Sequence, residues 1–195
     1  MKINVLGFLF ITALICYYYD IAILKAINLN RDTSLDFLFT CITNSAAPLA
    51  YGIPFLLLMV GLIKGNSLQQ KNAFYIIVSV LLCAAITSIF KYSINRPRPF
   101  ITYSFLQSIA EGGSPSFPSG HTCDAFVLAT AISLAYKKWY IAIPFFLWAF
   151  SVGYSRIDLG VHYPSDVLGG IIIGSGSALL CNEIRKQFNK QQINA

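Results

Sequence analysis

Three short stretches of the chain place basic and acidic side chains at the ends of long apolar segments. They read KYSINRPRP at 91–99, PSGH at 118–121 and SRIDLGVHYPSD at 155–166. Ionisable residues are costly near the apolar interior of a membrane and usually serve a function there. One such cluster could be a helix-end anchor, but three that face the same space predict a single chemical site.

The cations and small polar residues of these stretches suit a tetrahedral dianion. A guanidinium group offers a planar pair of donors to phosphate oxygens, and a lysine ammonium adds a point charge. A serine hydroxyl is a further donor, and a glycine at the start of a helix lets an anion approach backbone N–H groups. The predicted phosphate-binding residues are Lys91, Arg98, Ser119, Gly120 and Arg156.

Two histidines and an aspartate supply groups for nucleophilic attack and proton transfer. His162 and Asp166 are four residues apart. If a helix starts at 163–164, with Pro164 suited to its first turn, the carboxylate can reach back to the imidazole and fix its tautomer. The other ring nitrogen of His162 then faces the pocket as a nucleophile, and His121 is placed to donate a proton to the leaving oxygen.

Other ionisable residues near these stretches have simpler interpretations. Lys91 taken alone would serve equally well as an anchor whose side chain reaches the membrane surface. Arg96 is interpreted as part of a surface turn, and Asp158 as a solvated loop acid. Asp124 follows His121 by three residues, so it either orients that imidazole or faces water.

The composition predicts a membrane protein. The chain has 195 residues, of which 56% are hydrophobic and only 11% charged, whereas ordinary soluble domains carry about 25% charged residues. A soluble bundle of buried helices is the alternative, and the charge deficit disfavours it. We therefore expect an all-α integral membrane bundle that forms one domain over residues 1–195. A bilayer-spanning helix needs about 20 apolar residues, and six predicted spans meet that requirement: 3–19, 46–63, 72–90, 120–136, 139–155 and 167–182.

Shorter sequence patterns between and within the spans also indicate structure. Residues 20–45 have polar residues before a helical apolar pattern at Leu35, Leu38 and Ile42, which predicts a short interfacial helix between spans one and two. YYYD at 17–20 indicates an interfacial aromatic anchor. GGIIIGSG at 169–176 lies within a span and indicates close helix packing. The five cysteines have no paired spacing and are interpreted as small packing residues.

The distribution of basic residues predicts the orientation. Six spans put both termini on one side of the membrane, with eight Lys and Arg residues and one acid, whereas the other side has six basic residues and seven acids. The positive-inside rule then predicts cytoplasmic termini and an extracytoplasmic site in the cell (inner) membrane. The net charge of +6 is explained mostly by the cytoplasmic rim, so it implies no nucleic-acid partner.

The three clusters resemble the signature of the type 2 phosphatidic acid phosphatase superfamily. That pattern is Lys, six residues, Arg-Pro; then Pro-Ser-Gly-His; then Ser-Arg, five residues, His, three residues, Asp. Every spacing matches, over a motif-bearing core at about 88–172. The matching positions are Lys91, Arg98, Pro99, Pro118, Ser119, Gly120, His121, Ser155, Arg156, His162 and Asp166.

The resemblance implies a metal-independent and cofactor-independent membrane phosphatase. It implies a phosphohistidine on His162, oriented by Asp166, with His121 as the acid for the leaving group and the five predicted binding residues around the phosphoryl oxygens. Substrates implied by the family are phosphatidic acid, phosphatidylglycerol phosphate, polyprenyl diphosphates such as undecaprenyl diphosphate, and lipid A phosphates. A lipid reaches such a site by lateral diffusion in the bilayer.

Two alternatives are consistent with the same residues. A non-hydrolytic binder or translocator of lipid phosphates would use the cations equally well, but it does not need two histidines with an aspartate four residues after one of them. A metal site at His121 and His162 is disfavoured because neighbouring Lys and Arg side chains repel a metal cation.

Overall fold

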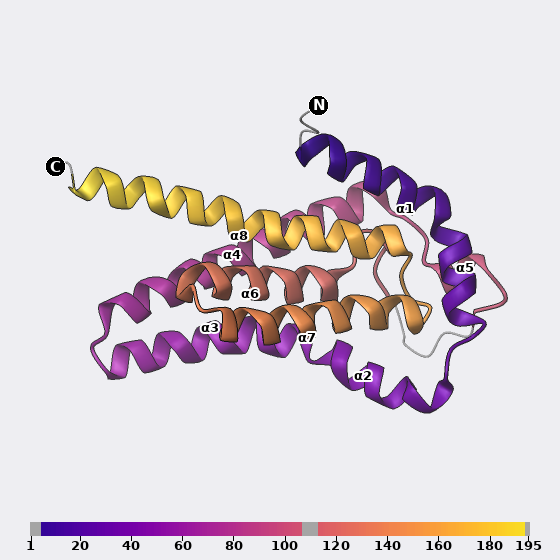
Figure 1. Ribbon diagram of the computed structural model, residues 1–195, viewed down its shortest axis with the longest axis horizontal. Coiled ribbons are helices and arrows are strands. Elements are labelled where there is room, and N and C mark those ends of the chain that lie inside the picture. Colours follow the sequence, from indigo (N-terminus) through magenta and orange to yellow (C-terminus); the bar gives the residue numbers. More distant parts are fainter. Residues whose placement is uncertain (1–4, 107–112, 194–195) are drawn as a thin grey trace.

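The computed structural model describes residues 5–106 and 113–193, with side chains at residue 12 and over 14–106 and 113–191. The described chain is helical with no β-strand, so the predicted all-α class is confirmed (Figure 1). Its elements are α1 (Val5–Asn28), η1 (Thr33–Leu35), α2 (Asp36–Asn44), α3 (Ala46–Ile63), α4 (Ser67–Ile94), α5 (Pro99–Thr102), α6 (Gly120–Tyr136), α7 (Trp139–Asp158) and α8 (Pro164–Ile193).

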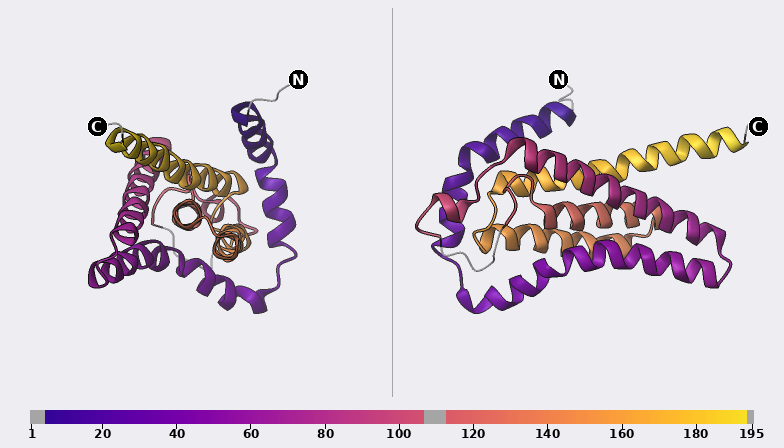
Figure 2. Two further views of the ribbon diagram at one scale, coloured as in Figure 1. Left: turned by 60° about the vertical axis from the view of Figure 1, so that its left-hand side comes forward. Right: turned by 180° about the vertical axis from the view of Figure 1, so that it is seen from behind.

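Helix α6 forms the centre of the bundle and packs against α3, α4, α7 and α8. The end-on view in Figure 2 shows α6 and α7 in the middle, with the other long helices around them. Two glycines let α8 approach α6 closely. A Cβ at Gly170 would lie 2.8 Å from Thr122 Cβ, and one at Gly174 would lie 2.6 Å from the Cys123 carbonyl oxygen. Gly170 and Gly174 within the 169–176 run therefore serve helix packing, as predicted.

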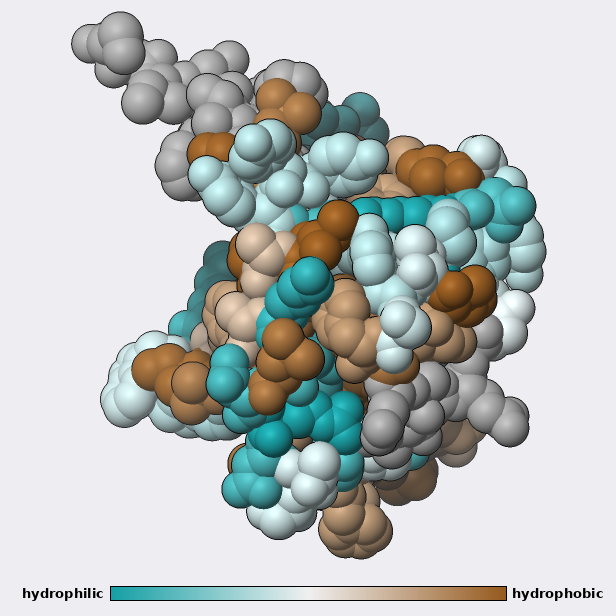
Figure 3. Space-filling model, turned by 90° about the vertical axis from the view of Figure 1, so that its right-hand side faces the viewer, coloured by the Kyte–Doolittle hydropathy of each residue, from teal (hydrophilic) through white to brown (hydrophobic). Residues whose placement is uncertain are grey.

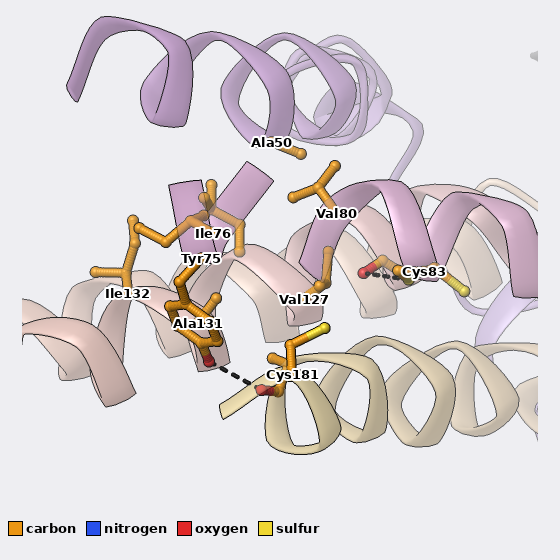
Figure 4. Packing of buried hydrophobic residues seen from close by; sticks show 12 residues of the cluster. Ala50, Tyr75, Ile76, Val80, Cys83, Val127, Ala131, Ile132 and Cys181 are labelled. Carbon is orange, nitrogen blue, oxygen red and sulfur yellow. Dashed lines mark hydrogen bonds between the residues drawn. The ribbon is translucent and has the colours of Figure 1, made fainter. Parts of the chain in front are cut away.

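The main hydrophobic core lies between α3, α4, α6 and α8 (Figure 4). Its fully buried members include Ala50, Ile76 and Val127. The Tyr75 hydroxyl donates a hydrogen bond to the Ala178 carbonyl oxygen at 2.9 Å, which satisfies the one polar atom that this ring carries. All five cysteines are free, and three of them lie in this core: Cys83, Cys123 and Cys181.

Four helical segments within the described residues are long and apolar enough to cross a membrane. They contain four of the predicted spans and are Thr33–Ile63, Ser67–Thr102, Trp139–Asp158 and Pro164–Gln191. The predicted span 120–136 coincides with α6, which has 17 residues. The predicted span 3–19 falls on α1, which continues to Asn28, while residues 3 and 4 lie outside the described chain. The count of six spans remains a prediction.

The segment between α1 and α3 forms η1 and α2, where a short helix was predicted. Asp32 begins it by accepting a hydrogen bond from the Ser34 backbone N–H at 2.9 Å. Helix α2 packs against α7 and leads into α3 through Ser45. Phe37 on α2 is 81% exposed. Its placement along the membrane surface remains a prediction.

The connections of the long helices fall at two opposite ends of the molecule. The α3–α4 turn, the α6–α7 turn and the C-terminal part of α8 lie at one end (Figure 1). The α4–α5 and α7–α8 connections lie at the other, together with the segment that precedes α6. Figure 3 looks onto this second end, where hydrophilic and apolar groups are interspersed. The three motif clusters lie here, as the topology predicted.

Candidate active site

The segment 114–119, just before α6, includes the start of the second cluster and contacts the first and the third. From the first cluster, Lys91 Nζ donates a hydrogen bond to the Pro115 carbonyl oxygen at 2.6 Å. Arg98 is buried and donates from Nε to the Ser114 carbonyl oxygen at 2.8 Å. Because α4 ends at Ile94, Lys91 in its last turn and Arg98 shortly after it are both placed at the end of the bundle.

The third cluster contains a buried histidine–aspartate pair. Helix α8 begins at Pro164, as predicted, and places Asp166 in its first turn. His162 Nδ1 lies 3.4 Å from Asp166 Oδ2, which is long for a hydrogen bond. The same oxygen accepts hydrogen bonds from Ser116 Oγ at 2.5 Å and from the Tyr163 backbone N–H at 2.9 Å. Two donors of the protein, the Ser116 hydroxyl and the Tyr163 N–H, therefore hold this oxygen next to the imidazole.

Burial keeps the His162 imidazole neutral. The side chain is 1% exposed. Burial lowers the pKa of His162 to about 3 and outweighs the opposing effect of Asp166, and the charges of Arg156 and Arg98 lower this pKa further. Nδ1 faces Asp166 and Ser116, which leaves Nε2 as the ring nitrogen available for chemistry. A neutral imidazole with one oriented nitrogen has the properties of a nucleophile.

Arg156 of the third cluster acts on the same histidine as two cations of the first cluster. It is buried, its Nη1 donates to Thr43 Oγ1 at 2.9 Å, and its Nε has no hydrogen-bond partner among the described residues. The charges of Arg156, Arg98 and Lys91 all act on the His121 imidazole. The structure therefore brings three cations of distant sequence position close to one histidine, and two of them also act on His162.

The start of α6 contributes the second cluster. Ser119 is fully buried, and its backbone N–H donates to the Asp166 carbonyl oxygen at 3.0 Å. Thr122 Oγ1 donates to Ser119 Oγ at 2.8 Å, so the Ser119 proton can be given to another acceptor. A Cβ at Gly120 would lie 3.8 Å from Lys91 Cε, so the lysine passes beside the first turn of α6.

The interpretation of Arg96 as a surface-turn residue is wrong. Its side chain is 18% exposed and lies between two carboxylates, donating to Asp20 Oδ2 at 2.8 Å and Asp166 Oδ1 at 2.7 Å. It also donates to Ser165 Oγ at 2.7 Å and stacks over the Tyr163 ring, 3.8 Å from its centroid. A largely buried guanidinium group can be accommodated between two carboxylates because each carboxylate offsets part of the cost of removing the charge from water.

Two acids also differ from their expected surroundings. Asp158 is the last residue of α7 and is only 4% exposed, so it is not a solvated loop acid. Asp124 is partly buried, and its charge acts on Tyr51 and Cys83. No described hydrogen bond joins Asp124 to His121. Helix packing, which a local sequence pattern does not reveal, determines both positions.

The sequence reasoning also missed residues that support the site. Ser116 lies two residues before Pro118 of PSGH, so a hydroxyl beside the motif was the available signal. Asp20 was grouped with the tyrosines of an interfacial anchor. The tyrosines are exposed, but Asp20 is 2% exposed and contacts the site. Nothing in the local sequence distinguishes it from an ordinary acid at a helix end.

The segment 99–117 is rich in aromatic residues, which predicts that it covers the site. Its described part, which includes α5, packs against the ends of α1 and α8, where Leu106 meets Leu24 and Tyr163 in a small apolar cluster. Residues 107–112 lie outside the described chain. Coverage of the pocket itself remains a prediction.

The fold and the site define an integral membrane helical protein with a cluster of cations near a buried histidine–aspartate pair. The family model of the PAP2 superfamily matches residues 72–190, and the chain belongs to this family. It is 31% identical over 144 residues to undecaprenyl-diphosphatase BcrC of Bacillus subtilis, covering 74% of this chain and 72% of that protein.

Two further comparisons agree with this family. Lipid A 4'-phosphatase of Bacteroides thetaiotaomicron is 36% identical over 80 residues, which cover 41% of this chain and 36% of that protein. The crystal structure of the first transmembrane PAP2 type phosphatidylglycerolphosphate phosphatase from Bacillus subtilis superposes with a TM-score of 0.72 at 27% identity, covering 92% of this chain and 94% of that one.

Proposed function

We propose that this protein is a metal-independent lipid phosphatase that hydrolyses a lipid phosphate or a polyprenyl diphosphate through a phosphohistidine at His162. The observation that carries the proposal is the buried, neutral His162, whose Nδ1 faces Asp166 and on which the charges of Arg156 and Arg98 act. Membership of the PAP2 superfamily supports a lipid phosphatase. One domain over residues 1–195 contains the whole site.

Five groups bind the phosphoryl oxygens in this proposal. Lys91, Arg98 and Arg156 offset the negative charge, and their existing hydrogen bonds to protein oxygens fix where each cation lies. Ser119 donates its hydroxyl proton, and the backbone N–H of Gly120 points from the start of α6 toward the anion. The bound dianion in turn offsets the three cations beside His121, which favours the protonated imidazole that an acid needs.

In the first step, His162 Nε2 attacks phosphorus. A P–N bond forms and the P–O bond to the leaving group breaks, while His121 gives its proton to the leaving oxygen. The leaving group is the lipid alcohol of a monophosphate, or the lipid monophosphate of a diphosphate. The imidazole becomes positively charged, and Asp166 stabilises that charge across the 3.4 Å contact.

In the second step, water attacks the phosphohistidine. His121, now neutral, takes a proton from the water, the P–N bond breaks, and its electron pair returns to His162 Nε2. Inorganic phosphate leaves, and both histidines regain their starting protonation. No step needs a metal, and a metal cation beside Lys91, Arg98 and Arg156 would be repelled.

The substrate class follows from the membrane setting. The relatives above are named for undecaprenyl diphosphate, lipid A and phosphatidylglycerolphosphate, and each of these carries phosphate on a lipid. A lipid in the bilayer reaches the end of the bundle by lateral diffusion while its tail stays among apolar helices. Lipid phosphates of the extracytoplasmic leaflet, including carrier-lipid diphosphates, are the proposed substrates.

The proposed sidedness rests on the end of the bundle opposite the site. Lys64 follows α3, Lys137 and Lys138 join α6 to α7, and Arg185 lies near the C-terminus. By the positive-inside rule this end is cytoplasmic and the site is extracytoplasmic. Ser104 is exposed at the site end. A Ser104→Cys variant in an otherwise cysteine-free chain should react with an impermeant thiol reagent in intact cells, and labelling only after lysis would reverse the orientation.

The direct test is phosphate release by detergent-purified protein with EDTA present. A panel of undecaprenyl diphosphate, phosphatidylglycerol phosphate, phosphatidic acid and lipid A should contain at least one substrate. A base-stable, acid-labile phosphoenzyme should be trapped with wild type and be absent in His162→Ala. Failure to release phosphate from any substrate, or release only after metal is added, would contradict the proposal. Flipping of a labelled lipid without phosphate loss would favour the translocator alternative.

A further inference from the structure

Helix α1 contributes a buried acid to the site. Asp20 is 2% exposed although it lies directly after three exposed tyrosines. Its Oδ1 accepts a hydrogen bond from the Ser165 backbone N–H at 2.8 Å, and its Oδ2 accepts from Ser165 Oγ at 2.5 Å. Asp20 therefore binds the first turn of α8 from a different helix, next to Asp166 in that turn.

Arg96 connects Asp20 to Asp166. Its Nη2 donates to Asp20 Oδ2 at 2.8 Å, while its Nη1 donates to Asp166 Oδ1 at 2.7 Å. The contact uses the oxygen of Asp166 that does not face His162. A planar guanidinium group can hold two carboxylates in fixed directions, which a lysine ammonium does less well.

We propose that Asp20 and Arg96 are positioning residues that hold the Asp166 carboxylate in the orientation its proposed role toward His162 requires. This inference rests on the proposed function, because it assigns a partner to the histidine–aspartate pair. Neither residue touches the phosphoryl oxygens in that function. Both act through Asp166, so they belong to the support of the nucleophile and not to the substrate pocket.

The geometry of the pair makes such support necessary. The 3.4 Å contact between His162 Nδ1 and Asp166 Oδ2 is too long to fix the carboxylate by itself. Ser116 and the Tyr163 N–H hold Oδ2, and Arg96 holds Oδ1. If Arg96 loses its charge, Oδ1 is left as a buried anion without its cation, and the carboxylate can turn away from the imidazole.

Asp20 has a related role one step further away. Its carboxylate contacts the opposite side of the guanidinium group and keeps the Arg96 side chain extended between the two acids. It also fixes Ser165, the residue before Asp166. Neutralising Asp20 should therefore weaken the hold of Arg96 on Asp166 without changing any group that binds phosphate.

The experiment compares Arg96→Gln, Asp20→Asn and the double variant with wild type on the best substrate of the panel. Loss of a supporting partner typically lowers activity by about 10- to 100-fold, so kcat should fall by that factor in each single variant, with KM within about twofold. The double variant should lose no more than about threefold beyond Arg96→Gln, because Asp20 acts mainly through Arg96. Arg96→Lys, which retains the charge, should recover part of kcat.

A matched control is the Arg31–Asp36 ion pair, which has the same 2.7 Å length and partial burial and has no proposed role. Asp36→Asn should leave kcat and KM near wild type. Unchanged kcat in Arg96→Gln and Asp20→Asn, a rise in KM with normal kcat, or fully additive losses would overturn the inference. If Arg96→Gln does not fold, Arg96→Lys and Asp20→Asn carry the same test. Wild type that releases no phosphate would overturn the proposed function first.

Discussion

Replacement of Asp166 by asparagine is the sharpest probe of the histidine–aspartate pair. All four groups around this carboxylate point hydrogens or charge at it: Arg96, Ser116, the Tyr163 N–H and His162. An asparagine has one accepting oxygen, so its NH2 must face at least one donor. Facing the NH2 toward Arg96 breaks one hydrogen bond, whereas the other orientation breaks two, so the carbonyl oxygen should stay beside His162.

The expected fall in kcat then comes mainly from the loss of the negative charge of Asp166. In the proposed mechanism the His162 imidazole becomes cationic when it is phosphorylated, and Asp166 lies 3.4 Å away. At an effective dielectric constant of about 20, opposite unit charges at that distance attract by about 5 kcal/mol. Arg96 on the other oxygen offsets part of this, which leaves about 3–4 kcal/mol. That amount corresponds to a fall in kcat of about 10²- to 10³-fold.

The assay is phosphate release at saturating substrate, with kcat and KM determined for wild type and Asp166→Asn. KM should change little, because Asp166 does not contact the phosphoryl group in the proposed mechanism. Size-exclusion behaviour and thermal stability in detergent check that the variant is folded. A folded Asp166→Asn enzyme whose kcat is within tenfold of wild type would refute the assignment of Asp166 as the stabiliser of a charged imidazole.

Three other predictions test binding, packing and protonation. Arg98→Lys cannot make both the Ser114 contact and the longer one to the Val161 carbonyl oxygen, so kcat/KM for phosphate release should fall at least about tenfold. Gly170→Val should lower the free energy of unfolding by about 1–3 kcal/mol, because Thr122 and the Ser119 carbonyl oxygen lie within 2.9 Å of an added Cβ. Gly176 has open space around it, so the control variant Gly176→Val should lower thermal stability in detergent much less. The pKa of His162 falls from 6.5 to about 3 on folding, so between these pH values the unfolded chain binds one more proton than the folded chain. The free energy of unfolding of wild type should therefore fall as the pH drops from 6 toward 4, by about 1.4 kcal/mol per pH unit more than that of His162→Ala. Parallel stability curves for those two proteins would show that His162 is not buried as described.

Residue spacing in the sequence predicted which motif residues would come together, but it did not predict the residues from other helices that contact them. The separation of His162 from Asp166 and the proline between them were enough to predict a helix start that brings the two side chains together. Lys91 and Arg98 could be placed at one end of the bundle because apolar spans fix which ends meet. Such arguments use only the position of a residue along its own helix.

The supporting residues depend on contacts between helices, which spacing along the chain does not encode. Arg96 lies in an RPRP stretch that is equally compatible with an exposed turn, and only the approach of α1 and α8 gives it two carboxylate partners. Asp20 is a single acid in another helix. Asp158 is the last residue of α7 and is buried by the surrounding chain, so its burial follows from the fold and not from its sequence context.

The close approach at Gly170 has a consequence for how the two histidines are spaced. His121 lies in the first turn of α6, and His162 lies two residues before the start of α8. These two helices are in direct contact, with Gly170 of α8 against Thr122 and the Ser119 carbonyl oxygen. In the proposed mechanism, the separation of His121 from His162 therefore depends on how α6 and α8 pack against each other. Under that mechanism the phosphorylated head group must fit between the two imidazoles, so selectivity among lipid substrates should depend on head-group size.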